Sequence, residues 1–366
     1  MVKRNIQRNS SLRGGLKSRR SNLILNSRTN VSRLLRRFTP RNDVKHISII
    51  LAPFSIGGPN DAAKDGPKAL MNNGIDDDLR ELGFNVKIVK PPKTIIPKNL
   101  SKAAINRGST KRIKNLEAII KINNWLSKTV TSEIKLGSIP ITIGGDHSLA
   151  IGTITGTSDA LKDIGVLWID RHFDAHSPKN TPSWRAHGMP VAVISAKKDF
   201  DPHPDFQKLL LIGESKRFPK VKPENIVQIA IGEKSHIKPK TKWYLMEDID
   251  NVGFKKVVDD ALNYLLRRVK YVYIAWDIDS MSVTGTGTSG DGQLTLREGL
   301  YLAREINKKI RLKNKLAGFE MMEVAPKLER KDLKGQTVDW AMQLITTCFG
   351  GNLFNNLSRL TKNIHV

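Results

Sequence analysis

Three apolar runs in this chain, at residues 139–143, 166–169 and 271–276, each lead directly into acidic or histidine residues. Together the three run ends supply two histidines and four aspartates: His147, Asp170, His172, Asp174, Asp277 and Asp279. After each of the last two runs the polar residues occupy alternate positions, and side chains two apart in a strand share a face. Because the carboxyl ends of parallel strands form the ligand crevice of an open sheet, we expect these six side chains to converge.

Four carboxylates and two imidazoles form a hard, oxygen-rich set of ligands. A structural zinc site prefers closed sets of thiolates and imidazoles, so this set suits Mn²⁺ or Mg²⁺ more closely. A single ion takes about six ligands and usually keeps waters among them, so the set is better explained by two ions that share bridging carboxylates. The sequence therefore predicts a dinuclear metallohydrolase.

Strand-like and helix-like segments alternate along the chain. We expect strands near residues 47–52, 84–89, 139–144, 165–170, 226–232, 242–246, 271–277 and 316–322. We expect helices near residues 68–71, 113–135, 148–161, 252–268, 296–311 and 336–349. The helix near 252–268 carries apolar residues that recur at the spacing of one helical face. Such alternation predicts an α/β fold with a doubly wound, mostly parallel sheet.

The N-terminal segment is strongly basic: its first 42 residues hold twelve Lys or Arg and no acid. The whole chain has 61 basic and 35 acidic residues, so the body keeps 49 against 35, a net charge of +14. We expect residues 1–45 to be disordered or removed, residues 46–355 to form one domain, and residues 356–366 to form a tail. A transit peptide, a polyanion-binding tail and a plain solvated tail remain open. The expected location is the cytoplasm, or the mitochondrial matrix if the segment is a transit peptide.

Composition narrows the remaining classes. Cys348 is the single cysteine of the 366 residues, which excludes an intrachain disulfide and favours a reducing compartment. No apolar run approaches the roughly 18 residues needed to span a membrane. Aromatic residues make up 6% and are not interleaved with basic ones, as binding of single-stranded nucleic acid would require. Nucleic acid is therefore not the expected partner.

Several short motifs, in this order and spacing, resemble the arginase (ureohydrolase) family. They are Ala52–Ser55, Gly66–Pro67, Gly144–Ser148, Asp170–Asp174, His187–Pro190, Asp277–Asp279, Gly285–Thr288, Leu294–Gly299 and Met322–Pro326. The resemblance runs from about residue 47 to 350. It implies an arginase-like three-layer α/β/α fold, two Mn²⁺ ions, hydrolysis of a guanidino compound, and assembly into a homo-oligomer, a trimer or hexamer. The first and fifth motifs look more like arginases than agmatinases, so L-arginine, hydrolysed to L-ornithine and urea, is the expected substrate.

The resemblance also implies how the metal ligands divide. One ion would be held by His147, Asp170, Asp174 and Asp277, and the other by His172, Asp170, Asp277 and Asp279. Asp170 and Asp277 would then bridge the two ions. Two cations lower the pKa of a shared water enough to make hydroxide near neutral pH, so this division agrees with the chemistry that the ligand set itself suggests.

Catalytic and substrate-binding roles follow from the same motifs. The catalytic residues would be His187, as a shuttle that protonates the leaving amine, Asp174, and Glu323. Glu323 would pair with the substrate guanidinium, to which a carboxylate gives a bidentate bond. The other substrate contacts would be His176, Ser183, Arg185 and Thr288.

The chain departs from the family pattern mainly around the substrate. Arg171 stands where the family usually has Ala, and strand alternation predicts that it points away from the metals toward a helix layer. His176 replaces a common Asn, and Trp184–Arg185 replaces Gly-Asn. The acidic contact to an α-amino group cannot be placed near Glu233. Two alternatives therefore stay open: another ureohydrolase that acts on agmatine or a different guanidino compound, and a catalytically idle basic relative that binds nucleic acid or a partner.

Overall fold

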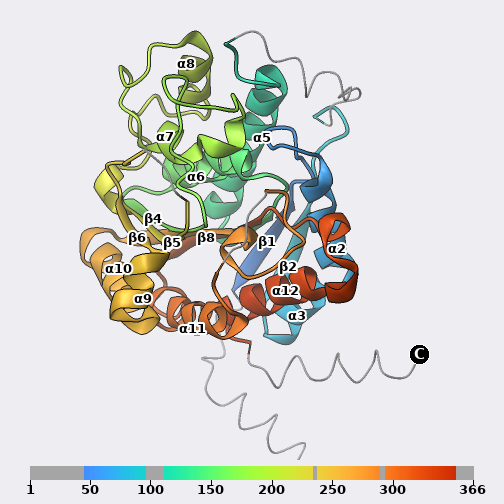
Figure 1. Ribbon diagram of the computed structural model, residues 1–366. Helices are drawn as coiled ribbons and strands as arrows, with labels where there is room; N and C mark the ends of the chain where they lie inside the picture. Colours follow the sequence, from blue (N-terminus) through green and yellow to red (C-terminus); the bar gives the residue numbers. More distant parts are fainter. Residues whose placement is uncertain (1–44, 96–110, 234–236, 289–292, 352–366) are drawn as a thin grey trace, which may run out of the picture. The chain divides into compact units, whose positions relative to one another are not determined.

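The computed structural model describes residues 45–95, 111–233, 237–288 and 293–351 (Figure 1). The expected N-terminal segment as far as Val44 and the expected tail at 356–366 lie outside these residues. The described part contains one eight-stranded sheet in the order β2-β1-β3-β8-β7-β4-β5-β6. The strands are β1 His46–Leu51, β2 Asn85–Val89, β3 Ser138–Ile143, β4 Ile164–Ile169, β5 Ile226–Ile231, β6 Lys242–Leu245, β7 Tyr271–Asp277 and β8 Leu316–Met322.

All neighbouring strands in this sheet pair in parallel. The helices that connect them are α2 Gly66–Asn72, α3 Ile75–Glu81, α5 Leu116–Lys135, α6 Ala150–Ala160, α7 Pro190–Ser195, α8 Pro204–Leu210, α9 Met246–Val252, α10 Phe254–Arg268, α11 Leu296–Ile306 and α12 Gln336–Cys348. Single turns of 3-10 helix lie among them, and a π-helix at Asn307–Arg311 continues α11. None of the described helices has both the length and the apolar character needed to cross a lipid bilayer.

Helices cover both faces of the sheet and make three layers. Apolar side chains alternate along each strand, so that Leu167 of β4 packs into one core cluster and Trp168 into another. One face carries α5 to α8, and the other carries α2, α3 and α9 to α12, as Figure 1 shows. The predicted three-layer α/β/α fold with a doubly wound parallel sheet is confirmed.

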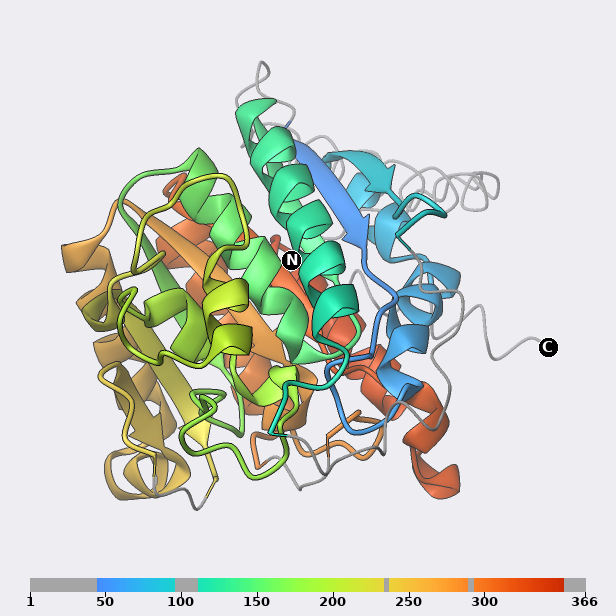
Figure 2. The ribbon, with the colours of Figure 1, turned by 90° about the horizontal axis from the view of Figure 1, so that it is seen from above.

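Close packing of α5 against α6 sets the position of the first predicted metal ligand. The two helices lie side by side over one face of the sheet (Figures 1 and 2). A Cβ added to Gly152 would lie 2.5 Å from the Asn123 carbonyl oxygen, and one added to Gly156 would lie 2.4 Å from that of Ser127. Only glycine allows this approach. Because α6 begins directly after the turn that holds His147, the same packing fixes that turn.

The helices differ from the sequence-based expectation in three ways. The predicted helix at 252–268 begins at Phe254, because Gly253 has φ +88° and separates it from α9. The predicted helix at 296–311 changes to a π-helix after Ile306. The short helices α3, α7, α8 and α9 were not predicted, since six or seven residues give too little helical periodicity to detect.

Candidate metal centre

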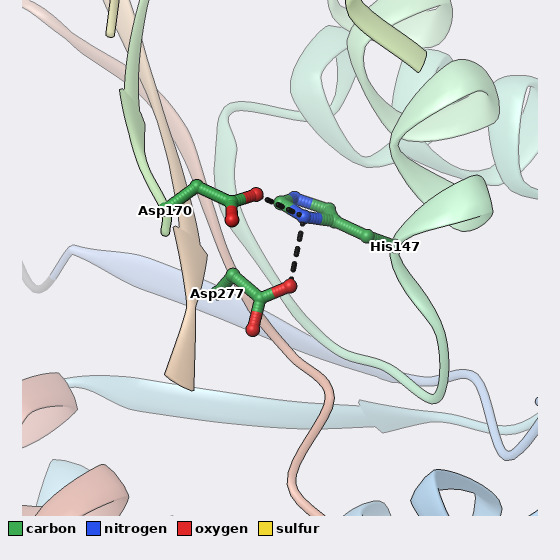
Figure 3. A group of neighbouring side chains, drawn as sticks. All are labelled: His147, Asp170 and Asp277. Carbon is green, nitrogen blue, oxygen red and sulfur yellow. Dashed lines mark ion pairs between the residues drawn. The ribbon is translucent and has the colours of Figure 1, made fainter. Parts of the chain in front are cut away.

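The strand order brings the predicted ligands together at the carboxyl edge of the sheet. Strand β3 leads through Gly144 and Gly145 to His147, and β7 ends at Asp277. Strand β4 leads to Asp170, and β4 pairs directly with β7. Figure 3 shows the His147 imidazole pointing at the Asp170 and Asp277 carboxylates.

The first group of potential ligands surrounds Nδ1 of His147. That nitrogen lies 3.0 Å from Oδ2 of Asp170, 3.1 Å from Oδ2 of Asp277 and 3.3 Å from Oδ2 of Asp174. His147, Asp170 and Asp277 form a buried cluster with the spacing of a metal site. Asp174, in the left-handed region at φ +49°, adds a third carboxylate on the same side. Its main-chain oxygen accepts a hydrogen bond from the Val191 amide, which holds this unusual conformation in place.

A second group of potential ligands lies next to the first and shares Asp170 with it. This group consists of Asp170, His172 and Asp279. Nδ1 of His172 lies 2.9 Å from Oδ2 of Asp279 and 3.6 Å from Oδ1 of Asp170. The geometry therefore places Asp170 between the two groups, and it brings together all six residues that the sequence singled out.

The charges in this cluster show why a cation fits. Burial works against a charged His147, but Asp170, Asp174, Asp277 and Glu320 outweigh it and raise the pKa of His147 well above its ordinary value. Burial and the neighbouring Asp170 raise the pKa of Asp174 to about 7. A neutral His147 would direct a lone pair at three carboxylate oxygens. Such a buried set of acceptors requires a positive charge at its centre, and Mn²⁺ or Mg²⁺ would supply it.

The pKa values of the two carboxyl groups at the end of β7, Asp277 and Asp279, shift in opposite directions. Burial, followed by the charges of Asp279 and Asp170, raises the pKa of Asp277 well above its ordinary value. Burial also opposes ionisation of Asp279, but His172 and other partners outweigh it and lower the pKa of Asp279. The Asp279 carboxylate accepts hydrogen bonds from the Arg171 amide and the Thr288 hydroxyl. The Thr288 hydroxyl, predicted as a substrate contact, thus binds a potential ligand carboxylate.

Glu323 lies beside the first group with half of its carboxylate unpaired. It is fully buried and has φ +61°. Its Oε1 accepts a hydrogen bond of 3.0 Å from the His147 amide, whereas Oε2 has no hydrogen-bond partner among the described residues. A Cβ added to Gly287 would lie 2.1 Å from Oε2, so any larger residue there would displace the Glu323 carboxylate. Burial, followed by the charges of Asp277 and Asp146, raises the pKa of Glu323 well above its ordinary value. A cationic partner at Oε2 would therefore stabilise the ionised form of this carboxylate.

His187 lies in a short 3-10 turn, and the His187 amide donates a hydrogen bond of 3.2 Å to the Gly57 carbonyl. Burial, followed by the positive charges of His172 and Arg185, lowers the pKa of His187 to about 3. The imidazole is therefore neutral near neutral pH. It can accept a proton before it passes one on.

Basic and polar residues line the segments beside His187. Nη1 of Arg185 donates to the Gly58 carbonyl at 2.6 Å, and the Arg185 amide donates to the Ser183 hydroxyl at 3.2 Å. Nε2 of His176 lies 3.9 Å from Oε1 of Glu233, and its buried Nδ1 has no hydrogen-bond partner among the described residues. His176, Ser183 and Arg185 are thus brought near one turn, with Glu233 beside His176.

Sequence reasoning did not identify three residues that support the centre. Trp168 donates from Nε1 to Oδ2 of Asp170 at 2.9 Å, and its ring stacks on that of His147 with centroids 4.1 Å apart. Asp146 binds the Gly57 and Ser148 amides. Glu320, buried in β8, lies behind His147. An indole and an acid inside apolar strands are the signals that point to Trp168 and Glu320. The Arg171 side chain passes beside Gly232, because a Cβ added to Gly232 would lie 3.7 Å from Cγ of Arg171.

Comparisons with known proteins agree with this architecture. The sequence model described as the Arginase family matches residues 45–350. Arginase-1 of Rattus norvegicus is 34% identical over 319 residues, which cover 84% of this chain and 93% of that protein. Arginase of Bacillus caldovelox is 32% identical over 319 residues, which cover 85% of this chain and 100% of that protein.

Solved structures give the same result. The structure of Bacillus caldovelox arginase has a TM-score of 0.72 at 30% identity and covers 84% of this chain and 99% of that one. The structure of Entamoeba histolytica arginase with L-ornithine has a TM-score of 0.71 at 25% identity, with coverage of 84% and 99%. These matches confirm the predicted family and, with it, the prediction of a dinuclear metal-dependent hydrolase of guanidino compounds. This chain belongs to the arginase family.

Proposed function

We propose that this protein is a manganese-dependent arginase that hydrolyses L-arginine to L-ornithine and urea. The buried, unpaired Oε2 of Glu323 carries the proposal, because it lies beside the aspartate cluster and needs a cationic partner. A guanidinium is planar and always charged near neutral pH, and it pairs with a carboxylate through two parallel hydrogen bonds. The names of the relatives agree with this choice of substrate.

We propose that two Mn²⁺ ions occupy the two ligand groups. His147, Asp170, Asp174 and Asp277 would hold one ion, and Asp170, His172, Asp277 and Asp279 the other. The donor set of carboxylates and imidazoles supports manganese over zinc. Such ions, when bound, supply Lewis-acid charge that makes water a nucleophile near neutral pH.

The remaining steps belong to the side chains of this chain. Glu323 would bind and orient the guanidinium so that its carbon faces the aspartate cluster. Water adds to that carbon, the bond from the carbon to the ε-nitrogen of arginine breaks, and this nitrogen takes up a proton and leaves as the side-chain amine of ornithine. His187, neutral and partly buried, would accept a proton as water adds and deliver it to that nitrogen. Burial of the site keeps bulk water away from the reacting carbon.

The head of the substrate would meet the segments around His187. Ser183, Arg185 and His176 would contact the α-carboxylate, and the carboxylate of Glu233, 3.9 Å from His176, would lie near the α-amino group. Thr288 would support the site through Asp279. We also propose that the protein forms a homo-oligomer, a trimer or a hexamer, which light scattering of the purified chain can measure.

The decisive experiment measures urea release from the purified chain with added Mn²⁺, on arginine and on agmatine. We expect arginine to be hydrolysed far faster, because agmatine lacks the carboxylate that Arg185 would bind. A preference for agmatine would instead support a different ureohydrolase. No urea from either substrate, with both ions bound, would support the idle relative.

Glu323→Gln tests the role of the guanidinium pair. The amide keeps the shape of the side chain but loses the charge, so kcat/KM on arginine should fall by about 100-fold or more. The bound manganese should stay at the level of the unaltered protein. Full activity in this variant would remove Glu323 from substrate binding.

A further inference from the structure

A buried carboxylate that the proposed reaction does not use lies behind His147. Glu320, in the middle of β8, is fully buried. Its Oε2 accepts hydrogen bonds from the Thr153 hydroxyl at 2.5 Å and the Tyr273 hydroxyl at 2.9 Å. Its Oε1 has no hydrogen-bond partner among the described residues and lies 3.8 Å from Nε2 of His147. Leaving one oxygen of a buried carboxylate unpaired is costly, so it calls for a functional explanation.

The surroundings of His147 define the direction of its ring. Nδ1 faces the Asp170, Asp174 and Asp277 carboxylates, and Nε2 faces Glu320. The ring stacks on Trp168 with an interplanar angle of 13°. Since stacking holds the plane of the ring, the remaining choice for a neutral imidazole is which nitrogen carries the proton.

We infer that Glu320 is a positioning residue that keeps the proton of His147 on Nε2. It thereby sets the affinity of the first ion, the one that His147 would bind. At 3.8 Å the attraction between Oε1 and the Nε2 proton is electrostatic, and burial strengthens it. Nδ1 then presents a lone pair to the cation. Carboxylates behind ligating imidazoles commonly act in this way, and their loss lowers metal affinity by about 10- to 100-fold. The inference rests on the proposed metal site, which supplies the cation.

The hydroxyl groups of Thr153 and Tyr273 make this inference testable, because they fix the orientation of a replacement amide. In Glu320→Gln the amide oxygen would accept from these two hydroxyls, and the amide nitrogen would then face His147. An amide N–H directed at Nε2 favours the tautomer with the proton on Nδ1, where it blocks the cation. A change of one atom therefore reverses the polarity behind the ring while the volume stays the same.

Chelator competition with Mn²⁺ on the full chain measures the affinity of each ion. We expect Glu320→Gln to bind the first ion about 10- to 100-fold more weakly and the second within about threefold of the unaltered protein. The control is Tyr273→Phe, which removes one hydroxyl from the same buried cluster but keeps the charge. It should change the affinity of the first ion by less than about threefold.

A spectroscopic readout separates a charge effect from loose packing. In protein labelled with ¹⁵N-histidine and loaded with diamagnetic Cd²⁺, the His147 imidazole should show Nδ1 without a proton and an Nε2 proton at low field. The low-field position should be kept in Tyr273→Phe and lost in Glu320→Gln. If Glu320→Gln does not fold, Glu320→Asp replaces it in the test. The shorter side chain moves the carboxylate away from His147 by one methylene, so the affinity for the first ion should fall severalfold.

Unchanged affinity in the Glu320 variant, or an equal loss in Tyr273→Phe, would overturn this inference and leave the proposed function intact. If the unaltered protein bound no ion at all, the proposed function would fail first, and the inference with it.

Discussion

Replacing Asp277 by Asn should stabilise the metal-free protein and remove most of the stabilisation that metal provides. Burial and the charges of Asp279 and Asp170 raise the pKa of Asp277, so its ionised form costs free energy at neutral pH when no cation is present. In the variant, Oδ1 can still accept from the Asp279 amide, as it does at 2.9 Å. We expect a gain of about 1–3 kcal/mol in the free energy of unfolding, the usual cost of a buried unpaired group.

Bound metal should reverse the order of the melting temperatures of the unaltered protein and Asp277→Asn. An ion present at a thousand times its Kd adds about 4 kcal/mol to the stability of the folded state. For a domain of this size about 2 °C in Tm corresponds to 1 kcal/mol, so each ion should raise the Tm of the unaltered protein by about 8 °C. The first ion should raise the Tm of Asp277→Asn by less than about 2 °C.

Thermal unfolding with Mn²⁺ and with a chelator measures both effects. Asp205→Asn is a matched control, because Asp205 is equally buried but is paired with Arg112 and the Ile113 amide away from the metal centre. It should lower the Tm without metal and keep the full shift on adding Mn²⁺. A metal-free Asp277→Asn with a lower Tm than the unaltered protein, or with an undiminished shift, would refute the reasoning.

Three further changes test the proposed proton shuttle, the contact with the substrate carboxylate and the basic N-terminal segment. His187→Ala should lower kcat at neutral pH far more than it raises KM. The pKa of His187 falls from 6.5 to about 3 on folding, so protonation of the unfolded chain destabilises the unaltered protein as the pH falls from 6.5 to 3. Denaturant titrations should therefore show a smaller loss of stability over this range in the variant than in the unaltered protein. Arg185→Ala should narrow the ratio of kcat/KM for arginine over agmatine, and an unchanged ratio would exclude contact with the carboxylate. A chain that begins at Arg41 should keep full activity and metal content, and lose only targeting or salt-sensitive binding to polyanions; inactivity would place the basic segment within the folded enzyme.

The strands and the potential metal ligands could be predicted from sequence for the same reason. The central strands are largely apolar runs, and His147, Asp170 and Asp277 follow or end such runs at the edge where parallel strands open. The first residues of these strands were predicted to within one or two positions. The sheet order could not be read from the sequence, since parallel strands meet through long-range contacts that no local pattern records.

The supporting residues were harder to predict. Glu320 stands in an apolar run, where its partners, Thr153 and Tyr273, come from a distant helix and a neighbouring strand. Which face it occupies follows from alternation, but which atoms it meets depends on the order of the sheet. The depressed pKa of His187 likewise arises from desolvation and from the charges of His172 and Arg185, which no periodic sequence pattern records. Sequence patterns therefore located the centre more fully than the residues that tune it.

The position of β8 has a consequence for how the enzyme matures. This strand is the last of the eight along the chain, yet it lies between β3 and β7, so without β8 the partial sheet β2-β1-β3 has no pairing to the partial sheet β7-β4-β5-β6. His147 belongs to one partial sheet, and Asp170 and Asp277 belong to the other. A nascent chain that ends before Leu316 thus has no site at which these side chains can meet around an ion. The strand order thus makes the potential metal ligands depend on β8, and a product truncated before this strand should not bind the ions of the proposed site.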